Sequence, residues 1–280
     1  MTSPIRLGIF GWPVAHSKSP QMHESAARAL GIELRYDRFA VEPSALAEAV
    51  RQKHAEGIDG YNLTVPHKQA IMELLDEVAP SAAAIGAVNT VVHSGDRYVG
   101  HNTDAPGFVR SLVDAGVTVP DSRTVILGAG GAARAAVVGL AEAEARHIVV
   151  LSRRPEQSEA LISSLGALVD CGLEAAPFSD AAEHFGAATL LVQATSATLG
   201  SNPRAQEFAD SLPIDALPSN AAVVDMVYDP LRTTVLERAA RRGLVTVDGL
   251  GMLLHQGAIA FEMWTGFEAP IDVMRDAIGA

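Results

Sequence analysis

The stretch from Thr124 to Arg154 constrains the fold of this 280-residue chain more than any other. A short apolar run, residues 125–127, leads into a glycine-rich turn. Alanine-rich helix formers follow over 132–144, and a second apolar run covers 147–151. Short apolar runs of this kind form buried parallel strands, and a strand, tight turn, helix and strand make a βαβ unit. The stretch therefore predicts a parallel sheet covered by helices.

The turn in this unit has the spacing of a dinucleotide site. Gly128, Gly130 and Ala133 fit the pattern G-x-G-x-x-G/A, with Gly131 and Ala132 between them. The first glycine permits a tight turn, the second lets a pyrophosphate approach the backbone, and the small third residue lets the helix pack on the strand. The helix N-terminus also attracts phosphate. We expect a bound dinucleotide here; the alternative is a glycine-rich turn in an ordinary α/β domain.

The residues after the second strand favour NADP over NAD. NAD sites usually place an acidic residue there to accept from the ribose 2′-hydroxyl. This chain has Ser152, Arg153 and Arg154 instead, and two planar guanidinium groups suit a 2′-phosphate. The alternative is that the arginines lie on a solvated loop.

Composition limits the partners. A net charge of −12 argues against nucleic acid, which favours a basic surface, although a local cluster of Lys and Arg can still attract an anionic substrate. Cys171 is the only cysteine, so no intrachain disulfide is possible and a reducing compartment is expected. We find no signal peptide, membrane span or zinc-type spacing. We expect a cytoplasmic protein that binds small molecules.

Strands and helices alternate along the rest of the chain. Strands are expected at 5–10, 33–41, 60–65, 84–92, 189–193, 222–225 and 244–247, and helices at 20–30, 43–56, 69–78, 106–115, 155–165 and 232–242, with another carrying Trp264. This alternation predicts an α/β fold with a doubly wound sheet.

Polar residues mark the loops of the N-terminal half. Ser17 and Ser19 could both bind a polyol or carboxylate, but Ser19 precedes a proline and could instead cap the next helix. Lys68 follows strand 60–65, whose Thr64 alternates with apolar neighbours. Ligands gather at strand ends in open α/β sheets, so Lys68 could be a positive donor there, or an ordinary surface lysine.

Two further residues have two interpretations each. Asn89 interrupts an apolar run, and a buried amide needs partners; it is either a structural hydrogen-bonding residue or a ligand contact. Asp104 either caps helix 106–115 or is the carboxylate partner of Lys68.

Seven segments in order resemble the shikimate dehydrogenase family over essentially the whole chain: GWPVAHSKSPQMH, GYNLTVPHK, IGAVNTV, GHNTD, LGAGGAARA, DMVYDP and DGLGMLLHQGAIAFEMWTG. That family reduces 3-dehydroshikimate to shikimate with NADPH in aromatic amino-acid biosynthesis. The resemblance implies an α/β protein of two domains. An N-terminal substrate domain would comprise 1–105 plus 250–280, and a Rossmann-type NADP domain 106–249.

The resemblance also implies residue roles, with Lys68 and Asp104 as the catalytic pair. Substrate contacts would be Ser17, Ser19, Thr64, Asn89, Asp104, Tyr228 and Gln256. Cofactor contacts would be Gly128, Gly130, Gly131, Ala132, Ser152, Arg153, Arg154, Thr195, Met226 and Gly249. The chain departs from the family's usual Asn-Arg-Thr at Ser152–Arg154, and from Asn-Ala-Thr-Ser-x-Gly at Gln193 and Thr198. No metal is implied.

Reduction converts a carbonyl oxygen into an alkoxide, so a proton donor must lie about 3 Å from that oxygen. We expect Lys68 to be that donor and Asp104 to orient it. Three other hypotheses are a quinate/shikimate dehydrogenase that uses NAD, a non-catalytic NADP-binding paralogue, and another two-domain NADP enzyme such as a methylenetetrahydrofolate dehydrogenase. The protein would be a monomer or a homodimer.

Overall fold

The computed structural model describes residues 4–280 and divides into two compact units. Unit 1 comprises the described residues up to Gly107 together with Leu253–Ala280, and unit 2 comprises Phe108–Met252. The chain enters unit 2 within helix α4 (Asp104–Asp114) and leaves it within α10 (Leu250–Thr265). Each unit holds one six-stranded sheet, so the predicted α/β class is confirmed. No helix in the described part of the chain is long and apolar enough to cross a membrane.

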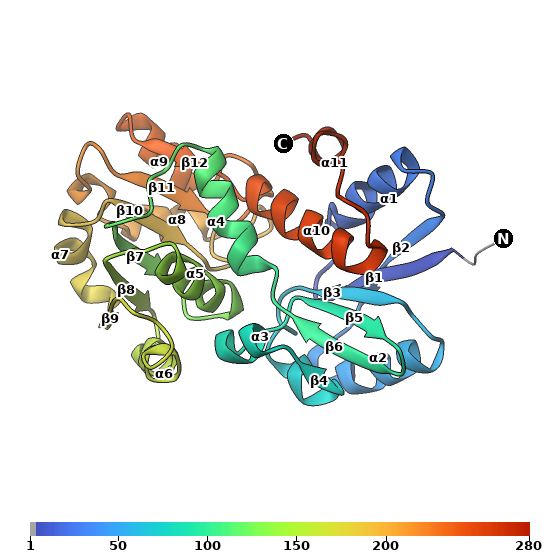
Figure 1. The fold of residues 1–280 in the computed structure, drawn as a ribbon. Helices are drawn as coiled ribbons and strands as arrows, with labels where there is room; N and C mark the ends of the chain where they lie inside the picture. Colours follow the sequence, from blue (N-terminus) through green and yellow to red (C-terminus); the bar gives the residue numbers. More distant parts are fainter. Residues whose placement is uncertain (1–3) are drawn as a thin grey trace. The chain divides into compact units, whose positions relative to one another are not determined.

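Unit 1 contains a mixed sheet with the order β2-β1-β3-β5-β6-β4 (Figure 1). Its strands are β1 (Ile5–Gly11), β2 (Leu34–Ala40), β3 (Gly60–Leu63), β4 (Glu77–Val78), β5 (Thr90–Ser94) and β6 (Arg97–His101). Its helices are α1 (Ser19–Ala29), α2 (Leu46–Ala55), α3 (Pro80–Ile85) and α11 (Ile271–Ile278), with 3-10 turns at Pro43–Ala45 and Ala70–Leu74. Strand β1 runs parallel to β2 and β3, whereas β5 runs antiparallel to β3 and β6.

Helices cover both faces of this sheet because successive side chains of β1 point to opposite sides. Leu7 and Ile9 belong to a cluster against which Trp264 of α10 packs. Phe10 belongs to a second cluster that includes Val50 of α2. Figure 1 shows α1 and α2 on opposite faces of the strands.

Two predicted elements of unit 1 are wrong. The expected helix 69–78 is a 3-10 turn followed by β4, because Glu77 and Val78 pair with β6. The expected strand 84–92 is divided between two elements. Its first residues end α3, Gly86 follows in the left-handed conformation (φ 71°), and β5 begins only at Thr90. The hairpin of β5 and β6 has no counterpart in the prediction, which gave a polar loop at 100–104.

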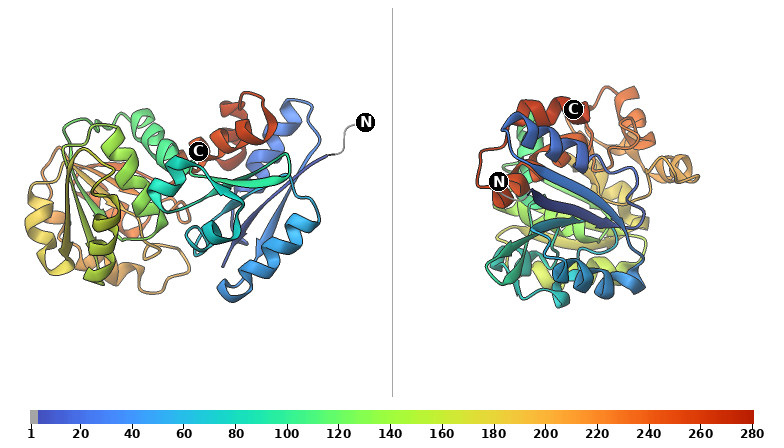
Figure 2. Two further views of the ribbon diagram at one scale, coloured as in Figure 1. Left: turned by 60° about the horizontal axis from the view of Figure 1, so that its bottom comes forward. Right: turned by 90° about the vertical axis from the view of Figure 1, so that its right-hand side faces the viewer.

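Unit 2 contains a parallel sheet with the order β12-β11-β10-β7-β8-β9. Its strands are β7 (Arg123–Leu127), β8 (His147–Ser152), β9 (Gly172–Pro177), β10 (Leu190–Gln193), β11 (Ala222–Asp225) and β12 (Val245–Val247). Its helices are α5 (Gly131–Glu142), α6 (Pro155–Leu165), α7 (Ala181–Gly186), α8 (Ala205–Ser211) and α9 (Thr234–Arg241), which cover both sides of the sheet (Figure 2).

The βαβ unit predicted at 124–154 is present as β7, α5 and β8. Strand β7 lies between β8 and β10, so the strand order reverses there, and ligands of doubly wound sheets bind at the carboxyl end of such a strand. Strand β9 was not predicted, because its polar Glu174 interrupts the apolar run that marks the central strands.

Candidate active site

One edge of the unit 1 sheet gathers most of the buried polar residues of that unit. The carboxyl ends of β1 and β3 lie together, since Phe10 pairs with Leu63. Strand β5 begins and β6 ends at the same edge, since Thr90 pairs with both Asn62 and His101. The segments 11–19, 62–68, 89–90 and 102–104 are therefore neighbours, and we call them the polar edge.

An ion pair lies at this edge. Lys68 Nζ is 2.6 Å from Asp104 Oδ2, and the two side chains are 16% and 5% exposed. The other carboxylate oxygen of Asp104 accepts from Asn89 Nδ2 at 2.9 Å. Lys68 is thus not an ordinary surface lysine. Asp104 is the partner of Lys68, as one of its two interpretations predicted, and it is the first residue of α4.

Asn89 connects the pair to its neighbours. Its Nδ2 also donates to Thr103 Oγ1 at 2.9 Å and to Gln256 Oε1 at 3.3 Å. Its Oδ1 accepts from the Thr103 backbone N–H at 2.7 Å. Asn89 is only 2% exposed, and both the oxygen and the nitrogen of its amide have partners within unit 1 in this structure. The structure therefore brings together four predicted residues: Lys68, Asp104, Asn89 and Gln256.

Two residues of this network were not predicted as site residues. Asn62 accepts from the Tyr36 hydroxyl at 2.6 Å and donates to Asn89 O and Thr90 Oγ1, each at 3.0 Å. Thr103 joins Asn89 to Thr90. The period-2 alternation of residues 60–65 places Asn62 on the same face as Thr64. That pattern is the one feature of the sequence that could have identified Asn62 as a site residue. Thr64, at the end of β3, is half-buried.

The two serines lie between β1 and α1. Ser17 and Ser19 are 7% and 2% exposed. The suggestion that Ser19 caps the helix is wrong, because Ser19 is the first residue of α1 and Lys18 takes the N-cap position without a side-chain bond. Instead, Ser17 Oγ accepts from the Ser19 N–H at 3.3 Å.

The glycine turn of unit 2 fits a dinucleotide phosphate. Gly128 has a φ of +112°, and a Cβ there would lie 2.7 Å from Thr195 Cγ2, so only glycine is accommodated. At Gly130 a Cβ would meet no atom within 4 Å, which leaves open space above the backbone. Gly131 and Ala132 begin α5, whose N-cap has no side-chain bond. Free N–H groups and open space together suit a phosphate.

Ser152, the last residue of β8, and the two arginines that follow it lie beside this turn, because β8 pairs with β7. Ser152 Oγ donates to the Arg154 carbonyl at 2.6 Å and so closes the turn. Arg153 and Arg154 are exposed, and neither takes part in the ion pairs that residues 4–280 form. Both guanidinium groups are therefore available to an anion.

Three family models match the chain. The shikimate dehydrogenase substrate binding domain matches residues 9–91, the shikimate/quinate 5-dehydrogenase model matches 112–213, and the shikimate 5′-dehydrogenase C-terminal domain matches 249–278. A shikimate dehydrogenase (NADP(+)) of Symbiobacterium thermophilum is 44% identical over 277 residues, covering 97% of this chain and 92% of that protein.

The chain belongs to the shikimate dehydrogenase family. The structure of shikimate 5-dehydrogenase from Thermus thermophilus in complex with NADP(H) and shikimate is 38% identical, with a TM-score of 0.83 and 98% of each chain covered. The quinate dehydrogenase of Corynebacterium glutamicum in complex with NAD is 29% identical, with a TM-score of 0.88 and 98% of each chain covered.

The two departures from the family pattern, at the end of β10 and in the loop that follows it, contact each other. Gln193 Nε2 donates to Thr198 Oγ1 at 2.8 Å and to Asp225 Oδ1 at 3.1 Å, and Gln193 Oε1 accepts from the Thr195 N–H at 2.6 Å. Burial raises the pKa of Asp225 above its ordinary value, opposed by bonds from Val227 and other donors. The amide of Gln193, longer than the family's Asn, and the hydroxyl of Thr198, where the family has Gly, thus form a hydrogen bond with each other beside the Gly128 turn.

Three other predicted residues of this shikimate dehydrogenase family member lie in unit 2. Met226 follows β11, and its N–H donates to Gln193 O at 3.0 Å. Gly249 lies against the Met226 carbonyl, where a side chain would collide. Tyr228 lies between β11 and α9.

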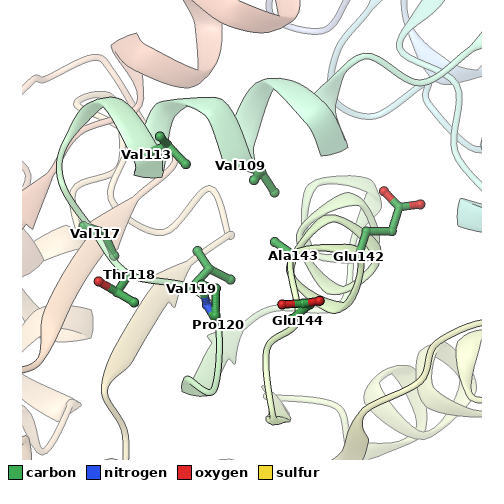
Figure 3. A pocket seen from close by; sticks show the side chains of 9 residues that line it. All are labelled: Val109, Val113, Val117, Thr118, Val119, Pro120, Glu142, Ala143 and Glu144. Atoms are coloured by element: carbon green, nitrogen blue, oxygen red, sulfur yellow. The ribbon is translucent and has the colours of Figure 1, made fainter.

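A hollow of about 370 Å³ in unit 2 lies apart from the glycine turn. Figure 3 shows Val109 and Val113 of α4 facing Ala143, at the C-terminal end of α5. The glycine turn is at the other end of this helix, about 18 Å away. The hollow is therefore separate from the predicted cofactor residues. No cluster of His, Cys, Asp and Glu in residues 4–280 could hold a metal ion.

Proposed function

We propose that this protein is an NADP-dependent shikimate dehydrogenase, an oxidoreductase that reduces 3-dehydroshikimate to shikimate with NADPH. The observation that carries the proposal is the part-buried 2.6 Å pair of Lys68 and Asp104, held by Asn89, in a member of this family. We assign residues 1–105 and 250–280 to the substrate domain and 106–249 to the cofactor domain.

Lys68 is the proposed proton donor. Bound NADPH supplies the hydride. Reduction leaves negative charge on the substrate oxygen, and an ammonium group has three N–H donors. One donor of Lys68 is directed to Asp104, so the others are available to that oxygen. Lys68 then transfers a proton to the alkoxide, and its neutral amine accepts a proton in the reverse direction.

The positions of the other polar residues support their proposed roles. Asp104 orients Lys68 and accepts a substrate hydroxyl. Ser17 and Ser19, at the positive N-terminus of α1, bind the substrate carboxylate. The remaining substrate contacts would be Thr64, Asn89, Tyr228 and Gln256.

The cofactor residues are proposed on the same basis. The open space at Gly130 and the N-terminus of α5 accept the pyrophosphate. Arg153 and Arg154, exposed after β8, bind the 2′-phosphate. The remaining contacts would be Gly128, Gly131, Ala132, Ser152, Thr195, Met226 and Gly249.

The test is the initial rate of oxidation for four combinations: shikimate or quinate, each with NADP or NAD. We expect rapid turnover with shikimate and NADP, and slower turnover with the other three. Faster turnover of quinate with NAD would make the protein a quinate dehydrogenase. NADP binding without turnover of either substrate would make it a non-catalytic paralogue.

We place the protein in the cytoplasm, because its one cysteine suits a reducing compartment. It would act on small molecules without nucleic acid, as a monomer or a homodimer.

A further inference from the structure

An arginine from a neighbouring strand holds the loop that carries the serines. Nε and Nη2 of Arg38 both donate to the Ser17 carbonyl oxygen, at 3.2 and 2.6 Å. The parallel register of β1 and β2 places Arg38 opposite Ile9, just before β1 ends and residues 12–19, the serine loop, begin. The guanidinium group therefore lies at the base of the serine loop.

Arg38 has no ion-pair partner among residues 4–280, unlike a second arginine on the same strand. Arg35, on the same strand, pairs with Asp37 at 2.9 Å. By contrast, none of the ion pairs within residues 4–280 includes Arg38. A second cation belongs to the loop itself: Lys18 Nζ donates to the Ile278 carbonyl at 2.6 Å, at the C-terminal end of α11. The serine loop thus carries one cation, Lys18, and contacts a second, Arg38, in a protein whose net charge is −12.

The Arg38 guanidinium is close enough to act on an anion at the serines. The carbonyl and hydroxyl oxygens of one residue are only a few ångströms apart, so the Arg38 guanidinium is within about 8 Å of Ser17 Oγ. Ser17 and Ser19 are buried, and burial weakens the screening of nearby charges by water and salt. Arg38 is itself exposed, which limits its effect to a modest one.

We propose that Arg38 positions the serine loop and gives it a preference for a carboxylate over an uncharged group in the same place. The inference rests on the proposed function, in which Ser17 and Ser19 bind the substrate carboxylate. Arg38 contacts the backbone rather than the substrate, so it acts as a positioning residue that also supplies charge.

The test compares shikimate with its uncharged methyl ester at saturating NADP. Arg38→Gln is expected to raise KM for shikimate about 3- to 10-fold, with kcat within about twofold, because one partly screened charge is lost. The same variant should change KM for the ester less than about twofold. Arg38→Lys keeps the charge and should retain most of the preference. Arg35→Gln, the matched control on the same strand, should leave KM unchanged for both substrates.

The acid-to-ester comparison separates charge from structure. If Arg38 had a purely structural role, Arg38→Gln would raise KM for the acid and the ester equally, and Arg38→Lys would raise KM as much as Arg38→Gln does. Either result overturns the inference, as does an unchanged KM for shikimate in Arg38→Gln. If the unaltered protein does not oxidise shikimate, the proposed function is wrong and the inference falls with it. If it does, an unaffected Arg38→Gln variant overturns the inference alone.

Discussion

Replacing Lys68 by methionine should remove catalysis while leaving a folded protein. Methionine matches the length of the lysine side chain but cannot donate a proton. The loss of a general acid lowers kcat by roughly 10²- to 10⁴-fold, which corresponds to about 2.7–5.5 kcal/mol in the activation barrier. KM for shikimate should change less than about tenfold, because the serine loop, Thr64, Asn89 and Gln256 remain.

The stability cost of this change can be worked from the ion pair. Asp104 is 5% exposed and loses its bond from Lys68 but keeps the one from Asn89. Losing one hydrogen bond to a charged group costs about 1.5–3 kcal/mol. A domain of ordinary stability, about 5–15 kcal/mol, survives that loss, so the variant should remain folded and bind NADP.

The assay combines steady-state shikimate oxidation, NADP binding and urea unfolding. Only three lysines occur in the chain, and Lys53→Met is the matched control. Lys53 makes a 2.7 Å surface pair with Glu56, and such pairs contribute about 0–1 kcal/mol. The control should keep its kcat. A Lys68→Met protein with kcat within about threefold of the unaltered one would refute the assignment of Lys68 as proton donor.

Three further predictions follow from buried or open positions. Gly130→Ala should raise KM for NADP about tenfold or more with little change in unfolding free energy, because its Cβ would fill space left for phosphate; unchanged NADP binding would contradict the cofactor assignment. Gly128→Ala should instead lose about 1–3 kcal/mol of stability, since the φ of Gly128 is +112°. Burial lowers the pKa of His23 from 6.5 to about 3, so between these values only the unfolded state takes up a proton on this imidazole, and the free energy of unfolding falls as the pH falls. In urea unfolding, His23→Leu should therefore lose about 2 kcal/mol less stability than the unaltered protein between about pH 7 and about pH 5. An equal loss in the two proteins would contradict this. Gln193→Leu and Thr198→Val should show a coupling of about 1 kcal/mol in a double-mutant cycle of unfolding, whereas additive effects would show that their 2.8 Å bond contributes nothing.

The cofactor half of the fold could be predicted from local sequence. Central parallel strands are buried on both faces, so they appear as continuous apolar runs, and the glycines at 128 and 130 mark the turn that follows. Strand β9 lies at the edge of the sheet and carries Glu174. It lacks that pattern and was missed.

The polar edge could be predicted only in part. Lys68 and Asp104 were paired as one of two interpretations, and their 2.6 Å contact confirms the pairing. The bonds that hold them arise from strand register, since β5 and β6 form a hairpin that brings Thr103 to Asn89. Register depends on long-range pairing rather than on local pattern, so the roles of Thr103 and Arg38 could not be predicted.

The most direct test of the proposed function is the forward reaction with NADPH that carries deuterium on the transferred position of its nicotinamide ring. With 3-dehydroshikimate, we predict one shikimate formed per NADPH consumed, with the deuterium on the ring carbon that was the carbonyl. NADPH that binds but is not consumed, or consumption without labelled shikimate, would contradict the account.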